Sequence, residues 1–106
     1  MAEKECICFE KKELAIVEEI FAERNKVSYS QIFVNASQIR KIFFDRHEIQ
    51  KFFKVVESEK IVIALRTRVE PIVILKHRHP ELFDSYKQNL IKFAEANKIP
   101  VENLLA

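Results

Sequence analysis

The residues best suited to meet an anion lie in the middle of the chain. If residues 36 to about 57 form one amphipathic helix, five side chains fall within about 80° of one another, opposite its apolar face: Arg40, Phe44, His47, Lys51 and Lys54. A helix face that combines cations with an exposed aromatic ring could lie against phosphates or in a major groove. The alternative is that this face is an ordinary surface exposed to solvent.

Two of these residues have a spacing that is also found in a nuclease family. Arg40 and His47 are separated by six residues, and this Arg-x6-His spacing is similar to the motif of the HEPN ribonucleases, which are all-helical proteins. The resemblance implies that the two side chains act on the scissile phosphate and ribose of an RNA. It adds a metal-independent ribonuclease to the functional hypotheses.

Charge is distributed unevenly along the chain. Residues 26–54 carry six basic and two acidic residues, and residues 60–79 carry five basic residues and one acidic residue. The ends of the chain are acidic, so the net charge is only +2. A basic middle is what a binding face for a polyanion needs. It adds Arg66 and Arg68 to the candidate phosphate contacts.

Cysteine and histidine occur as two close pairs, Cys6-x-Cys8 and His77-x-His79. If residues 6–9 form a strand beside the strand that ends near His77, the pairs could offer two thiolates and two imidazoles to zinc. Standard zinc sites have longer spacings than one intervening residue. The alternative interpretation is two buried thiols and two surface histidines.

Other catalytic patterns are missing from the sequence. The chain contains no glycine, which excludes the phosphate-binding loops of the P-loop and dinucleotide-binding families. Nothing in the sequence places a serine, a histidine and an acid together as a triad. An enzyme is therefore unsupported, and we expect no cofactor.

Composition and length indicate a single globular domain, residues 1–106. Of its 106 residues, 48% are hydrophobic and 32% are charged, well away from the composition of disordered chains. The longest apolar stretches are much shorter than the roughly 20 residues that span a bilayer, and residues 1–5 lack a secretory signal. We expect a cytoplasmic protein without membrane association.

Apolar periodicity predicts helices in the first half of the chain. One helix spans residues 10–24. A second, shorter helix spans residues 28–34, although the same residues also favour a strand. A third helix begins after Asn35 and runs to about Glu57, unless a capping box at Asp45 splits it.

The second half of the chain predicts a hairpin and a further helix. Residues 61–66 and 72–77 are rich in β-branched residues, and the connection between them is too short for anything but antiparallel pairing. A third strand at residues 6–9, or a second copy of the protein, should complete this hairpin. A helix then spans residues 80–97, and the apolar tail at 101–106 either folds back onto the core or docks on a partner.

The sequence thus predicts an α+β fold of three or four helices packed on a short antiparallel β-hairpin. Over residues 10–77 this order of elements resembles a winged helix-turn-helix module, which implies that one helix reads the major groove while the hairpin touches the backbone. The leading hypothesis is a nucleic-acid-binding protein, such as a transcriptional regulator, that forms a homodimer through the hairpin or the C-terminal segment. The alternative is a protein–protein interaction or oligomerisation module with an apolar sheet interface.

Overall fold

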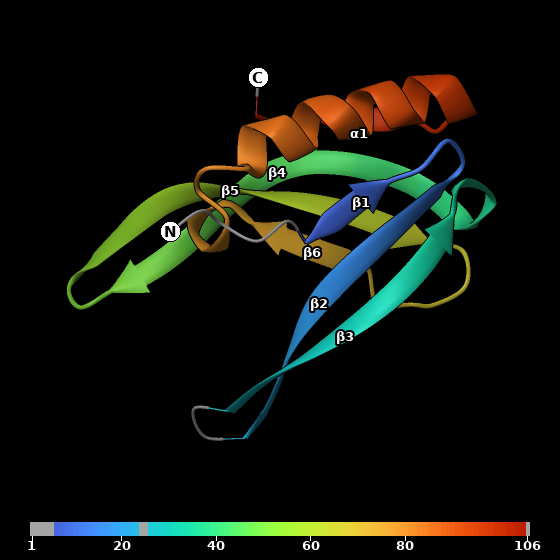
Figure 1. Cartoon of the computed structure of the whole chain (residues 1–106). Helices are drawn as coiled ribbons and strands as arrows, with labels where there is room; N and C mark the ends of the chain where they lie inside the picture. The colour runs from blue at the N-terminus through green and yellow to red at the C-terminus, as the bar shows by residue number, and fades with distance from the viewer. Residues whose placement is uncertain (1–5, 24–25, 106) are drawn as a thin grey trace.

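Most of the chain is β-strand (Figure 1). The computed structural model describes residues 6–23 and 26–105, with the backbone alone given for residues 18–23 and 26–28. The elements of this part of the chain are, in order, β1 (Ile7–Phe9), β2 (Glu13–Glu23), β3 (Lys26–Asn35), η1 (Ala36–Gln38), β4 (Ile39–Lys51), β5 (Lys54–Leu65), β6 (Ile72–Leu75), η2 (Lys76–Arg78), α1 (Phe83–Asn97) and β7 (Val101–Asn103).

The strands form two sheets. The three-stranded sheet has the order β1-β2-β3 and is antiparallel throughout, and the four-stranded sheet has the order β6-β5-β4-β7. Within the second sheet β4, β5 and β6 are antiparallel neighbours, whereas β7 returns after the helix to pair in parallel with β4. Two long hairpins, β2–β3 and β4–β5, project from the body of the molecule (Figure 1).

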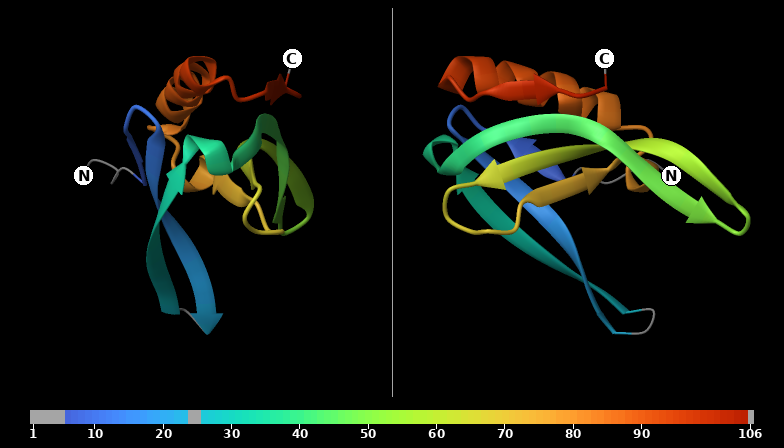
Figure 2. Two further views of the ribbon diagram at one scale, coloured as in Figure 1. Left: turned by 90° about the vertical axis from the view of Figure 1, so that its right-hand side faces the viewer. Right: turned by 180° about the vertical axis from the view of Figure 1, so that it is seen from behind.

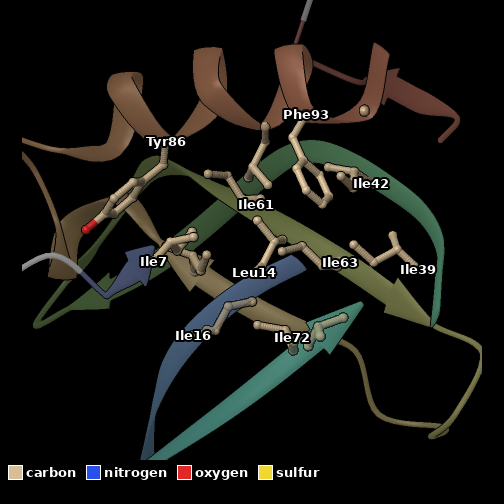
Figure 3. Close-up of a cluster of buried hydrophobic side chains, with 14 of the residues drawn as sticks. Ile7, Leu14, Ile16, Ile39, Ile42, Ile61, Ile63, Ile72, Tyr86 and Phe93 are labelled. Carbon is tan, nitrogen blue, oxygen red and sulfur yellow. The ribbon is translucent and has the colours of Figure 1, made fainter. Parts of the chain in front are cut away.

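The core lies between the two sheets and is closed by α1 (Figures 2 and 3). Leu14 and Ile16 of β2 are buried on one side, and Ile61 and Ile63 of β5 are buried on the other. Leu90 of α1 is also fully buried among them. Burying such side chains stabilises the fold by roughly 25 cal/mol for each Å² of apolar surface removed from water. This shared cluster therefore holds the two sheets and the helix together.

Polar contacts fix α1 to the three-stranded sheet at both ends. The backbone N–H of Cys6 donates a buried 2.8 Å hydrogen bond to the Tyr86 hydroxyl, near the start of the helix. At the other end the Asn97 amide donates to the Lys11 carbonyl at 3.0 Å. Lys98 then ends the helix in the left-handed conformation, with a φ of 57°, where glycine is the usual residue.

The helix predicted at residues 10–24 is wrong, because most of these residues form β2. Arg24 and Asn25, where the prediction ends that helix, lie outside the described residues. Leu14 and Ile16 are buried and Ala15 between them is less so, which is the alternation of a strand. Leu14 and Val17, three residues apart, suggested a helix but point to opposite faces of the sheet.

Residues 28–34 are a strand, so the alternative prediction for this segment is confirmed and the helix is wrong. Asn35 does act as a cap: its side chain accepts from Ser37 N–H at 3.0 Å while Gln38 accepts from Asn35 N–H at 2.8 Å. The helix that this capping box opens is only the 3-10 turn η1, and the chain continues as β4.

The long helix predicted up to Glu57 is also wrong, because β4 and β5 pair with each other from Ile39↔Leu65 to Lys51↔Lys54. The turn between them consists of Phe52 and Phe53, which are 98% and 102% exposed. Phe52 has a φ of 43°, a strained value for a residue other than glycine or asparagine. Long-range strand pairing has here overridden an apolar pattern that fits a helix.

The predicted fold class is therefore corrected. The described part of the chain has two sheets and one α-helix, rather than three or four helices on a hairpin. The helix-turn-helix that would make a winged-helix module is replaced by β2, β3 and β4, so that resemblance is wrong. The HEPN ribonucleases are all-helical, so their architecture also differs from the one found here.

Predictions for the second half of the chain fare better. The antiparallel hairpin is confirmed as β5 and β6, with Ile61↔Ile74 and Ile63↔Ile72 in register. The C-terminal helix is confirmed as α1, although it begins only at Phe83. The strand expected at residues 6–9 exists as β1 but joins β2 rather than the hairpin. The tail folds back as β7; its last residue, Ala106, lies outside the described residues.

Candidate nucleic-acid interface

Strand alternation separates charge between the two faces of the four-stranded sheet. One face of β4 and β5 packs on the core through Ile42, Phe44 and Ile61. Successive side chains of a strand point to opposite faces, so the residues between these point away from the core. The charged outward residues are mainly basic, and we call the following set the basic face: Lys41, His47, Lys51, Lys54, Lys60 and Arg66.

Acidic side chains mostly lie on the other face of the same two strands. By the alternation along each strand, Glu48, Glu57 and Glu59 lie on the same face as the core-facing residues. Arg46 is the single cation of β4 and β5 on that face. Among the described residues of β4 and β5, only Asp45 is acidic and outward-facing. The sheet therefore presents a positive potential outward although the whole chain is nearly neutral.

An apolar strip crosses the middle of the basic face. Phe43 is in register with Val62, and Val62 with Val73, so one row of apolar side chains crosses three strands. Phe43 is partly buried and Val73 is 47% exposed. The Lys41 ammonium lies 6.0 Å from the centroid of the Phe43 ring and is also ion-paired with Glu102 of β7. Val62, in the middle of the strip, is only 5% exposed, so the strip is open to solvent at its two ends.

A groove of about 840 Å³ runs beside β6, between the four-stranded sheet and β2. Its lining includes His47 and Ile49 of the β4–β5 hairpin as well as His77 and Arg78 of η2. The His47 and His77 rings are stacked, with centroids 5.7 Å apart and planes 5° from parallel. This contact brings η2 to the distal part of the basic face.

The groove is an unfavourable place for an additional positive charge. Partial burial lowers the pKa of His77, and the positive charges of His47, Arg78 and Lys51 lower it further. A group in this situation is mostly neutral at pH 7 and gains its proton more readily when an anion enters.

A second hollow, of about 650 Å³, lies at the other end of the basic face. Arg40, Arg66 and Arg68 line it together with Phe43. Arg68 also lines the groove beside β6, so the two hollows meet at this residue. The Arg68 guanidinium donates to the Glu70 carbonyl at 2.8 Å, which orients it within the β5–β6 connection.

Most of the predicted nucleic-acid-binding residues thus lie on this surface, but strands rather than a helix bring them there. Arg40, Arg66 and Arg68 come together at one end of the face, and His47, Lys51 and Lys54 lie toward the other end. The predicted helix would have placed Arg40, His47, Lys51 and Lys54 within a few turns, whereas the curved sheet spreads these residues along its length (Figure 2).

Phe44 does not belong to this surface. It was grouped with Arg40, His47 and Lys51 by the 100° step of a helix, but its side chain is 0% exposed and packs in the core. In a strand, position 44 points to the face opposite positions 43 and 47. Phe43 is the aromatic residue that the outward face carries.

The ribonuclease pairing of Arg40 with His47 is not assembled. Seven residues of extended strand separate them by roughly 23 Å, too far for both to act on one phosphodiester. Their spacing would bring them to one helical face, and there is no helix here. The structure therefore does not support the catalytic roles that the resemblance to HEPN ribonucleases implied for Arg40 and His47.

The four candidate metal ligands are only partly brought together. Cys6 is buried and lines the groove with His77 and His79, but Cys8 is exposed and does not. His79 instead meets the Tyr86 ring edge-on, with centroids 6.1 Å apart. Among the residues that the structure describes, no group of three or more histidine, cysteine or acidic side chains is placed to hold a metal ion.

Sequence reasoning missed Lys60, His77 and Phe43 as members of the site. A strand period of two would have found Phe43, because it places position 43 on one face with Lys41, His47 and Lys51. The same period places Lys60 on one face with Lys54. The proximity of His77 to His47 had no local signal, since it depends on β6 pairing beside β5.

Comparisons with known proteins do not place the chain in a family. No protein-family model matches it, and no curated protein or solved structure matches it significantly. Within the described residues, no helix has both the length and the apolar character needed to cross a membrane. Function must therefore be argued from the site itself.

Proposed function

We propose that the protein binds single-stranded nucleic acid along the basic face. The observation that carries this proposal is the segregation of charge on β4 and β5: Lys51, Lys54 and Arg66 point outward, while the acids Glu57 and Glu59 point the other way. Cations in a row along a strand match the repeating phosphates of an extended backbone. We place this activity in the cytosol, where the thiols would stay reduced.

The apolar strip favours a single strand over a duplex. Unpaired bases expose their faces and edges, and can pack on an aromatic ring and on aliphatic side chains. Phe43 and Val73 offer such a surface between two cationic ends, while Val62 between them is buried. A duplex would present phosphates alone to this strip and leave its apolar side chains without a matching partner.

The central experiment is fluorescence anisotropy with a labelled twelve-nucleotide single strand, as DNA and as RNA, at several salt concentrations. We expect binding to weaken as salt rises, and Lys54→Gln and Arg66→Gln each to reduce the slope of log K against log salt by about 0.7. Arg46→Gln is the matched control, because Arg46 is an exposed cation of the same β4–β5 hairpin that points to the other face.

Two outcomes would contradict the proposal. Binding of the wild type that is absent or indifferent to salt would remove the polyanion as ligand. An equal loss with Arg46→Gln would show that overall charge, rather than the basic face, attracts the strand. A duplex of the same length that binds as tightly as the single strand would assign the face to duplex backbone instead.

The apolar strip has its own variant, Phe43→Ala. Loss of a base–aromatic contact should weaken single-strand binding at least about fivefold, with little change in the salt dependence. The same variant should leave binding to heparin, a polyanion without bases, almost unchanged.

A further inference from the structure

The longest free sheet edge in the described part of the chain belongs to β3. This strand covers Lys26–Asn35 and pairs with β2 on one side only. The other free edges are shorter: β1, β6 and β7 have three or four residues each, and β2, β4 and β5 are open on one side only where these short strands do not reach, for example over residues 45–51 of β4. An edge of ten residues is a template on which another strand can add.

Hydrogen bonding in β1 and β2 shows which β3 residues face this edge. Val17 N–H donates to the Cys6 carbonyl at 2.8 Å, so Val17 directs its backbone groups to β1 and away from β3. Gln31 of β3 lies opposite Val17, so these two residues form a non-hydrogen-bonded pair. Gln31 therefore directs its own N–H and C=O to the open edge. By alternation Tyr29 and Phe33 do the same.

A second bond confirms this assignment. Asn35 has the same parity as Gln31, and its N–H is indeed not used by β2, since it donates to the Gln38 side chain at 2.8 Å. At the alternate positions the backbone groups point toward β2 instead, as the Ala36 N–H shows by donating to the Lys12 carbonyl at 2.7 Å. Three residues in the middle of β3 thus offer backbone donors and acceptors that β2 leaves available.

The β3 edge also lacks the features that normally prevent strand addition. Its ten residues contain one charged residue, Lys26, and no proline. Tyr29 and Phe33 point to the same face of the strand and are 66% and 65% exposed. Large aromatic side chains left this exposed on a neutral edge are characteristic of a surface that becomes covered.

We propose that two copies of the protein associate by antiparallel pairing of β3 with β3, centred on Gln31, so that the two three-stranded sheets become one. In this register Tyr29 of each copy lies opposite Phe33 of the other, and each pair exchanges both of its free backbone hydrogen bonds. Cross-strand aromatic pairs add to the stability of such a ladder.

A second copy fits the edge better than an unrelated strand because β3 is complementary to itself. Two-fold symmetry about Gln31 matches an aromatic residue with an aromatic residue twice, and places Lys26 opposite the neutral Ala36 rather than another cation. The interface lies on the three-stranded sheet, so this inference does not depend on the basic face or on nucleic-acid binding.

Sedimentation equilibrium of the full chain, without nucleic acid, tests the association. We expect dimers at tens of micromolar, and Gln31→Pro should raise the dissociation constant at least about tenfold, because proline removes a donor from the dimer ladder alone. Gln31→Ala keeps the donor and should dimerise as the wild type does. Circular dichroism checks that each variant folds.

A charge exchange keeps the proposal testable if the proline variant does not fold. Tyr29→Lys with Phe33→Lys places like charges across both aromatic pairs and should give monomers, whereas Tyr29→Glu with Phe33→Lys places opposite charges there and should give dimers. A wild type that is monomeric at about 100 micromolar would overturn the proposal and leave the edge to a strand of another protein. Equal dimerisation of both double variants would overturn the register.

Discussion

The two faces of the four-stranded sheet differ more than any two elements of the molecule, and two adjacent residues illustrate the difference. Phe44 is fully buried among the core side chains, while Phe43 lies in the apolar strip between the cations of the outward face. The inward face holds the sheet to α1, and the outward face carries the cations on which the proposed binding rests. A period of two thus assigns alternate residues of one strand to the core and to the proposed binding surface.

The same division explains where the acids are. Glu59 lies on the inward face and accepts from Lys76 of η2 at 2.8 Å and from Lys87 of α1 at 3.1 Å. The Lys87 ammonium also lies 5.8 Å from the centroids of the Phe44 and Phe83 rings. Lys76 and Lys87 are thus partnered with an acid of the inward face.

The largest expected effect distinguishes the two phenylalanines by stability. Phe44→Ala should lower the free energy of unfolding by about 3–5 kcal/mol, because it opens a cavity in the core. Phe43→Ala should lower it by less than about 1 kcal/mol. Urea denaturation followed by circular dichroism measures both, and similar losses for the two variants would contradict the division into faces.

The next effect concerns the protonation of His77. Since the pKa of His77 lies below its ordinary value of 6.5, the folded protein binds fewer protons than the unfolded chain near that pH. Stability of the free protein is therefore present above pH 6.5 and declines as the pH falls through the lowered pKa. A bound polyanion favours the protonated ring, so affinity should move in the opposite direction.

We expect single-strand affinity to rise roughly threefold or more between pH 7.5 and pH 5.5, measured by anisotropy at constant ionic strength. His77→Gln should remove most of this rise while retaining binding at pH 7.5. An unchanged pH dependence in His77→Gln would assign the effect to other groups.

A smaller effect is expected for the inward ion pairs. The hydrogen bond from Lys76, together with that from Lys87, lowers the pKa of Glu59, although its burial acts in the other direction. The stabilisation is therefore present above pH 4.5 and is lost as the pH falls through the lowered pKa. Glu59→Gln should cost at most about 1 kcal/mol at pH 7, and this cost should shrink as the pH falls below 4.5.

The smallest expected effect is a gain in stability at the tip of the β4–β5 hairpin. Phe52→Asn should raise the free energy of unfolding by about 0.5 kcal/mol, because asparagine tolerates a positive φ better than phenylalanine. Phe53→Asn is the matched control, since Phe53 is equally exposed and lacks the positive φ. Thermal denaturation at neutral pH measures the difference between the two variants.

The sequence predicted the second half of the fold well because its signals there are local. The short connection between residues 66 and 72 leaves only antiparallel pairing, and the apolar stripe of α1 is long and regular. Residues 10–57 were misassigned because their apolar residues fit both periods. Leu14 and Val17 fit a helix as well as Leu14 and Ile16 fit a strand, and pairing with distant residues decides between them.

The candidate site was predictable in part for a related reason. A count of basic residues finds Arg40, Lys51 and Arg66 whatever their secondary structure. The face on which each lies depends on whether the backbone turns by 100° or by 180° per residue, which is why Phe44 was included and Phe43 was not.

The contacts at the two ends of α1 have a consequence for how the molecule opens. Tyr86 and Asn97 bind Cys6 and Lys11, which flank β1, while Leu90 between them packs on side chains of both sheets. Removing the helix would strip the cover from the apolar residues of each sheet at once. Backbone amides at the base of the β2–β3 hairpin should therefore exchange their hydrogens only when the whole domain unfolds, whereas amides toward the tip of the β4–β5 hairpin exchange through local fraying.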